Sequence, residues 1–164
     1  MTGWLARAAL ALTVAAAAGC AAPPRAPSTD EAATSWSGRL SLQVEDRRLA
    51  SFSAGFDLQG SAQQGELTLT GPLGGTVAVL NWRPGAATMK SGERTSREFP
   101  SLEALAAEAT GTPLPIAALF DWLRGVDTRV PGWEADLSEV AQGRLRARRV
   151  DPPPAADLRI AFER

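Results

Sequence analysis

Residues 51–58, Ser-Phe-Ser-Ala-Gly-Phe-Asp-Leu, decide the fold class of this chain, because large apolar side chains alternate along them with small or polar ones. Phe52, Phe56 and Leu58 fall on one side of such a segment, and Ser53 and Asp57 fall on the other. A period of two is that of a β-strand with one buried face. The segment therefore predicts a half-buried strand.

The same alternation extends in both directions along the chain. It recurs in residues 40–45, 66–70, 143–150 and 158–162, while residues 76–82 form a more continuously apolar strand and residues 86–89 a short one. Turn-forming residues separate these segments at Arg47-Arg48, at Gly60–Gly65 and at Arg83-Pro84-Gly85. Turns at intervals of about eight to twelve residues predict a meandering antiparallel sheet with one apolar and one polar face.

The middle of the chain changes from a period of two to a helical period. Ser101 is a candidate cap for a helix that carries Leu102 and Leu105 and ends at Gly111. A second amphipathic helix places Ile116, Leu119, Phe120 and Leu123 on one face and ends at Gly125. An apolar sheet face needs a cover. The expected fold is therefore mainly β, an unclosed antiparallel half-barrel with short helices as a lid.

The N-terminus has the features of a secretory signal peptide. A basic residue, Arg7, precedes a short apolar run over residues 8–18, which is too short for an ordinary transmembrane helix. The exit, Ala17-Ala18-Gly19-Cys20, resembles the lipobox of bacterial lipoproteins, in which the cysteine becomes the acylated N-terminus. We interpret residues 1–19 as signal peptide, 20–35 as lipidated Cys20 and tether, and 36–164 as the domain. A plain signal peptide that happens to hold a cysteine is the alternative.

Composition excludes several classes of chemistry. The chain has one cysteine, no histidine and a net charge of −1. Without histidine, Ser-His and Cys-His catalysis and most zinc sites are excluded. The balanced charge gives no sign of a nucleic-acid groove. We therefore expect neither an enzyme nor a cofactor.

Four motifs carry a resemblance that spans the domain. They are Trp36-Ser-Gly-Arg-Leu, Ser51–Phe56, Leu67-Thr-Leu-Thr-Gly-Pro-Leu-Gly74, and Gly111-Thr-Pro-Leu-Pro-Ile116 leading into Leu119-Phe-Asp-Trp-Leu-Arg-Gly125. Their order and spacing resemble those of the outer-membrane lipoprotein receptor LolB family. The chain departs from that pattern at Leu58, where the family often has an aromatic residue, and at Val126-Asp127, where it often has a proline.

The resemblance implies a monomeric, lipid-anchored protein at the periplasmic face of the outer membrane. It implies that the protein takes acylated lipoproteins from the periplasmic carrier LolA and inserts them into outer-membrane lipid, with the acyl chains held in an apolar cavity. A structural lipoprotein that reuses the same curved sheet is the alternative. The candidate cavity residues share the apolar faces of the strands and of the second helix: Leu40, Leu42, Phe52, Phe56, Leu67, Leu69, Ile116, Leu119, Leu123, Leu158, Ile160 and Phe162.

Most of these residues also have a plain structural interpretation. Apolar strand faces are usually core, and we interpret Trp36, Trp82, Trp122 and Trp133 as packing anchors. The arginines at 144, 146, 148 and 149 are interpreted as a solvated strand face, with an acidic carrier or lipid headgroups as the alternative. The loop Gly71, Pro72, Leu73 and Gly74 is different. Glycine and proline explain a turn, but not a large apolar residue at its tip, so we predict that Leu73 enters the membrane.

Overall fold

The structure is a computed structural model that describes residues 34–46, 51–92, 95–110 and 113–164. Strands dominate it, and the two α-helices come between the sixth and seventh strands. The elements are β1 (Thr34–Val44), β2 (Phe52–Gly60), β3 (Gly65–Thr70), β4 (Thr76–Arg83), β5 (Ala86–Ser91), β6 (Thr95–Phe99), α1 (Leu102–Thr110), α2 (Ile116–Leu123), β7 (Trp133–Asp136), the 3-10 turn η1 (Val140–Gln142), β8 (Arg144–Arg149) and β9 (Ala156–Glu163).

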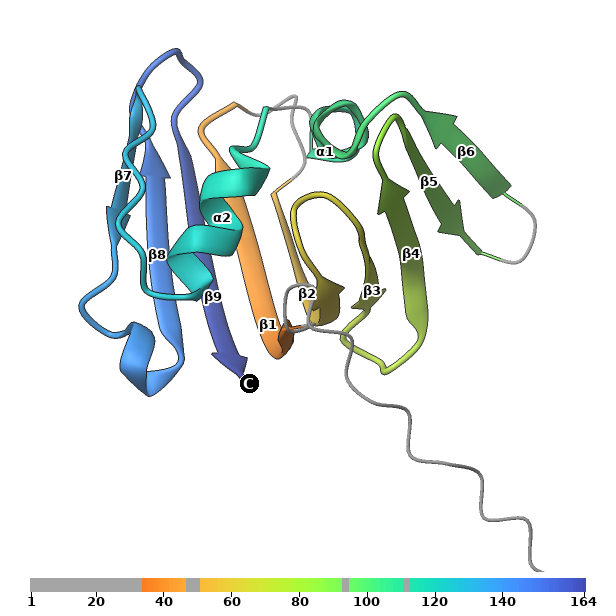
Figure 1. Cartoon of the computed structure of the whole chain (residues 1–164), viewed down its shortest axis with the longest axis horizontal. Coiled ribbons are helices and arrows are strands. Elements are labelled where there is room, and N and C mark those ends of the chain that lie inside the picture. Colours follow the sequence, from red (N-terminus) through yellow and green to blue (C-terminus); the bar gives the residue numbers. More distant parts are fainter. Residues whose placement is uncertain (1–33, 47–50, 93–94, 111–112) are drawn as a thin grey trace, which may run out of the picture.

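The strands form one antiparallel sheet in the order β6-β5-β4-β3-β2-β1-β9-β8-β7. β1 lies in the middle, where it pairs with β2 on one side and with β9, the last strand, on the other. The sheet curves around its apolar face without closing, because β6 and β7 end it on opposite sides (Figure 1). The predicted mainly-β half-barrel is therefore confirmed.

Strand register places the apolar residues on the concave face in rows. Trp36 lies opposite Leu58, Leu58 opposite Leu67, and Leu67 opposite Leu80. Because side chains alternate between the two faces of a strand, a common row puts all four on one face. The period of two in the sequence thus identified the inner face correctly.

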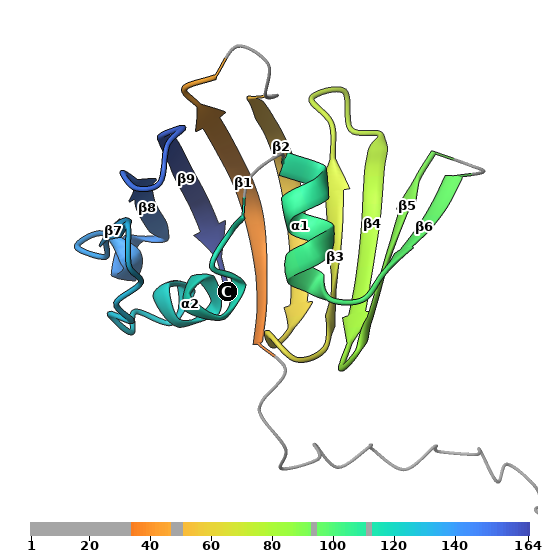
Figure 2. The same cartoon turned by 90° about the horizontal axis from the view of Figure 1, so that it is seen from above.

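The two helices lie against the concave face, α1 in front of the β2–β3 region and α2 beside β1 and β9 (Figure 2). The backbone N–H of Ala104 donates to Ser101 Oγ at 3.2 Å, so Ser101 caps α1 as predicted. α2 is followed by Gly125, whose φ of +83° is a conformation that favours glycine. Within the described residues no helix is long and apolar enough to cross a membrane.

Some boundaries differ from the sequence interpretation. β1 begins at Thr34, ahead of Trp36, and β5 continues to Ser91. Strands β6 and β7 were not predicted, because β6 is exposed along most of its length and β7 is only four residues long. The expected turn at Arg47-Arg48 and the signal and tether segment through residue 33 lie outside the described residues.

The interpretation of Arg149 as part of a solvated face is wrong. Arg149 is 4% exposed and lies on the inner side of β8, whereas Arg144, Arg146 and Arg148 point outward. Its guanidinium donates to the carbonyl oxygen of Pro154 from Nε at 3.2 Å and from Nη2 at 2.7 Å. A buried cation that satisfies a loop carbonyl is a structural residue. Because Arg148 and Arg149 are the same residue type, the sequence did not show that Arg149 lies on the inner face of β8.

Candidate functional site

The loop between β3 and β4 is a tight turn with Leu73 at its tip. The N–H of Gly71 donates to the carbonyl of Gly75 at 2.9 Å, and the N–H of Gly74 donates to the carbonyl of Gly71 at 3.0 Å. These bonds close the turn, and Gly74 adopts a φ of +84° within it. Leu73 is fully exposed, at 101%. The side chain therefore buries nothing within the described domain, and its entry into the membrane stays a prediction.

The concave face brings all the candidate cavity residues into one apolar cluster. Half of them are buried there, namely Leu42, Phe56, Leu123, Leu158, Ile160 and Phe162. The other half, Leu40, Phe52, Leu67, Leu69, Ile116 and Leu119, are partly buried and pack against the same cluster. Whether any of them touches an acyl chain stays a prediction.

An aromatic group joins α2 to the sheet. The ring of Phe120 meets the ring of Trp36 edge-on, with centroids 5.8 Å apart, and the ring of Trp82 at 6.3 Å. Trp36, Trp82 and Phe120 are all buried. The tryptophans are packing anchors, as predicted. The sequence interpretation did not include Phe120 among the site residues, although its position four residues after Ile116 marks the same helix face.

The end of α2 is tied down by polar contacts. Asp121 pairs with Arg124 at 2.6 Å, and its other carboxylate oxygen accepts a hydrogen bond from the Thr128 hydroxyl at 2.7 Å. The Thr128 hydrogen bond, helped by Arg124 and opposed by partial burial, lowers the pKa of Asp121 below its usual value. The indole N–H of Trp122 donates to the Thr128 carbonyl at 2.9 Å.

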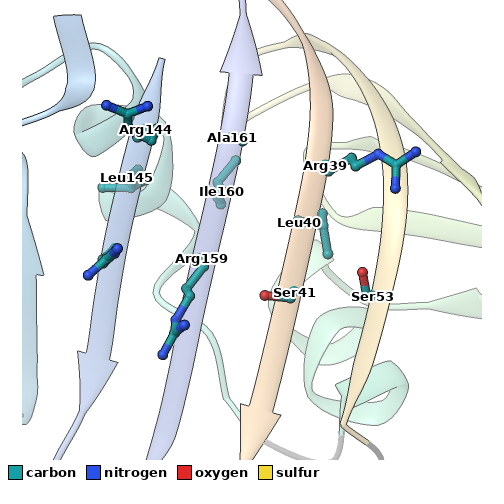
Figure 3. A pocket seen from close by; sticks show the side chains of 10 residues that line it. Arg39, Leu40, Ser41, Ser53, Arg144, Leu145, Arg159, Ile160 and Ala161 are labelled. Carbon is teal, nitrogen blue, oxygen red and sulfur yellow. The ribbon is translucent and has the colours of Figure 1, made fainter. Parts of the chain in front are cut away.

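Among the hollows on the surface of the described residues, two are of note. One, of about 260 Å³, lies on the convex face of β1, β8 and β9, and arginine side chains lie along it (Figure 3). Arg144 and Arg159 there pair with Glu139 at 3.1 Å and with Asp157 at 2.6 Å. These arginines are exposed, and whether they meet a carrier or lipid headgroups stays a prediction. The other hollow, of about 600 Å³, lies at the β7 edge between Trp122 and Trp133.

The described residues contain no cluster of His, Cys, Asp or Glu side chains that could hold a metal ion. What they do form is an open antiparallel half-barrel with helices on its apolar concave face and an exposed apolar residue on a loop at its rim. This architecture defines a class of protein suited to hold an apolar ligand beside a membrane.

Comparison with known proteins identifies the family. The family model described as "Outer membrane lipoprotein LolB" matches residues 33–151. The chain is 33% identical to the outer-membrane lipoprotein LolB of Bordetella petrii, over 97% of this chain and 90% of that protein. It is 38% identical to the protein of that name from Bordetella parapertussis, over 74% of this chain and 63% of that one, and 35% identical to that from Cupriavidus necator, over 76% and 64%. The chain belongs to the outer-membrane lipoprotein LolB family.

Proposed function

We propose that this protein is an outer-membrane lipoprotein receptor that accepts acylated lipoproteins from the periplasmic carrier LolA and inserts them into the outer membrane. Membership of the LolB family supports the general role in lipoprotein localization. The apolar concave face with its helical cover supports the binding of acyl chains. A charged, hydrogen-bonded catalytic centre is not required, because no covalent bond changes in such a transfer.

Elementary energetics explain why such a receptor is needed. Each CH₂ group moved from lipid into water costs about 0.8 kcal/mol, so the acyl chains of one lipoprotein cost on the order of tens of kcal/mol. A protein that carries them must replace the bilayer as their apolar surroundings. It must also release them, so its affinity for acyl chains has to lie between that of the carrier and that of the membrane.

The observation that carries the proposal is the complete exposure of Leu73 on a closed turn. A single exposed leucine is common in proteins, but this one stands at the tip of a hydrogen-bonded loop at the rim of the half-barrel. Full burial of its side chain in the membrane interface would gain roughly 1.5–3 kcal/mol. That gain is too small to anchor the protein but large enough to orient it. Insertion of Leu73 would therefore turn the rim of the half-barrel toward the membrane.

Loading requires the helices to shift. The candidate cavity residues contact one another and the helix side chains in this conformation. The aromatic contacts of Phe120 and the polar ties at the end of α2 hold that helix in place. We infer that acyl chains enter by displacing α2 from the concave face, since α2 is held there by side-chain contacts and not by pairing with a strand.

Anchoring and orientation belong to the same proposal. Acylation of Cys20 would hold the protein at the periplasmic face of the outer membrane. The protein would act there as a monomer with a single domain. Cys20 lies outside the described residues, so its support is the lipobox-like sequence before it. A scaffolding lipoprotein would need neither the exposed Leu73 nor an acyl-binding interior.

The test is a two-step transfer assay. A labelled lipoprotein bound to LolA is mixed with the receptor, and its receipt by the receptor is scored separately from its insertion into liposomes. We expect both steps to occur. Failure of the receptor to take the lipoprotein from LolA would exclude the proposed function and favour the scaffold.

A further inference from the structure

Trp36 carries a buried hydrogen-bond donor that the unliganded fold does not use. Its side chain is 1% exposed, and its indole Nε1–H finds no acceptor among the described residues. The indoles of the other two buried tryptophans differ in this respect. Trp82 donates from Nε1 to the Ser61 carbonyl at 2.9 Å, and Trp122 donates to the Thr128 carbonyl at 2.9 Å. Among the buried tryptophans that the structure describes, Trp36 is therefore the exception.

Such an orphan donor lowers stability, because the N–H has given up water without gaining a partner. A trapped water is a poor remedy here. A buried water needs two to four polar partners, whereas Trp36 faces the ring of Phe120 and belongs to the cluster of buried apolar side chains. Phenylalanine at this position would keep an aromatic ring and avoid the cost. We therefore infer that the acceptor for this donor is supplied by a bound ligand.

Its position matches the route proposed for the acyl chains. Trp36 lies on the inner face of β1, in register with Leu58, and is covered by Phe120 of α2. Displacement of α2 would uncover the indole at the moment of loading. Farther along the same strand face follow Leu40 and Leu42, which provide an apolar path for a chain whose polar end stays at Trp36.

We propose that Trp36 Nε1–H donates a hydrogen bond to an acyl carbonyl of the bound lipoprotein. The carbonyl at the head of an acyl chain is a strong acceptor, and it is the polar group closest to the apolar part of the chain. This contact fixes how deeply the chain enters and distinguishes acyl chains from plain alkyl chains. The inference rests on the proposed function, and it identifies Trp36 as the residue that recognises the acyl carbonyl of the lipoprotein.

The test compares two ligands that differ only in the carbonyl. One is a cysteinyl peptide carrying a diacylglyceryl group with short ester-linked chains, and the other is the same peptide with ether-linked chains. The chain from residue 20 onward is used, without the signal peptide and with Cys20→Ala in every sample, so that it stays in solution. We expect the parent to bind the ester about tenfold more tightly than the ether, a typical gain for one buried hydrogen bond.

Two matched variants assign that preference. Trp36→Phe should bind both ligands equally, with the affinity that the parent shows for the ether. Trp82→Phe, which removes an indole already satisfied by Ser61, should keep the tenfold preference. An ester preference that persists in Trp36→Phe contradicts the inference. Equal binding of both ligands by the parent contradicts the inference alone, whereas binding of neither contradicts the proposed function as well.

A measurement on the parent covers the case in which Trp36→Phe fails to fold. The ¹H–¹⁵N signal of the Trp36 indole should have the upfield proton shift of an unbonded N–H in the free protein. It should move downfield on adding the ester and stay nearly unchanged with the ether. A long-lived water in contact with this proton in the free protein would overturn the proposal.

Discussion

Arg164, the last residue of the chain, donates a hydrogen bond from Nη2 to the main-chain carbonyl of Leu123 at 2.7 Å, in the last turn of α2. The contact joins the end of β9 to the helix that covers it. A cation at a helix C-terminus also interacts favourably with the helix dipole. The Arg164 side chain therefore helps to hold the last turn of α2 against the sheet.

Arg164→Ala should loosen α2 while the sheet stays intact. The loss of one charge-assisted hydrogen bond should lower the free energy of unfolding by about 1 kcal/mol. Amide hydrogen exchange should speed up in residues 116–123 and not in β1 or β9. Arg83→Ala, which removes an exposed arginine at the β4–β5 turn, is the control. Unchanged exchange in α2 would show that Arg164 does not hold the helix.

Leu73→Glu should separate receipt of cargo from its insertion. The turn is exposed, so the fold and the uptake of a lipoprotein from LolA should persist. Insertion into liposomes should fail, because a carboxylate resists entering the membrane interface. The measurement is the two-step transfer assay described above.

Val126→Glu is the matched control for Leu73, since Val126 is also an exposed apolar residue, 52% exposed, but lies after α2. It should insert cargo like the parent. If Leu73→Glu inserts cargo as fast as the parent, Leu73 is only a turn residue. If it cannot receive cargo, the loop belongs to the carrier interface instead.

The Asp121–Thr128 contact should make stability depend on pH in acid. The pKa of Asp121 is lowered in the folded state, mainly by the Thr128 hydroxyl. A carboxyl whose folded pKa lies below its unfolded value, about 3.9, stabilises the fold above that value and loses this contribution as the pH falls through the folded pKa. Thr128→Val should therefore lower the free energy of unfolding by about 1 kcal/mol at neutral pH, and the difference from the parent should shrink below about pH 4.

Denaturant unfolding of the parent and of Thr128→Val at several pH values measures this difference. Asp57→Asn, which removes an exposed carboxylate from β2, serves as the control for general charge effects. A difference between the parent and Thr128→Val that stays constant down to the acid limit would contradict the role of Asp121.

Cys20→Ala, produced from residue 20 onward without the signal peptide, should not attach to membranes and should leave the domain folded. The described domain begins at Thr34, and its core is made of residues from Trp36 onward. Intact-mass analysis of the parent should find acyl groups on an N-terminal Cys20, and the variant should show the same thermal unfolding as the parent. A mature parent chain that starts elsewhere and carries no acyl mass would exclude the anchor.

The sequence predicted the elements whose signals are local. Alternation found the inner row of Leu58 and Leu67, Ser101 marked the start of α1, and Gly125 marked the end of α2. It missed β6 and β7, because an exposed strand and a very short one have no apolar alternation, and their pairing partners alone make them strands.

The candidate site divides in the same way. The exposure of Leu73 followed from the residues around it, since glycine and proline confine a turn to the surface. The inward position of Arg149, the contact between Arg164 and Leu123, and the unsatisfied donor of Trp36 could not be predicted. Each depends on which distant backbone group lies nearby, and only the folded arrangement decides that.

The placement of Leu73 also sets a requirement on the chain before the domain. Thr34 pairs with Gly60 at one end of the sheet, whereas the β3–β4 loop lies past the row of Arg39, Gly55 and Thr70 at the other end (Figure 2). The rise of β1 puts roughly 25 Å between these ends. Residues 20–33 can span at most roughly 50 Å. The length of this segment therefore exceeds the separation of the two ends of the sheet, which is the condition that an acylated Cys20 and the tip of Leu73 would need in order to meet the same bilayer.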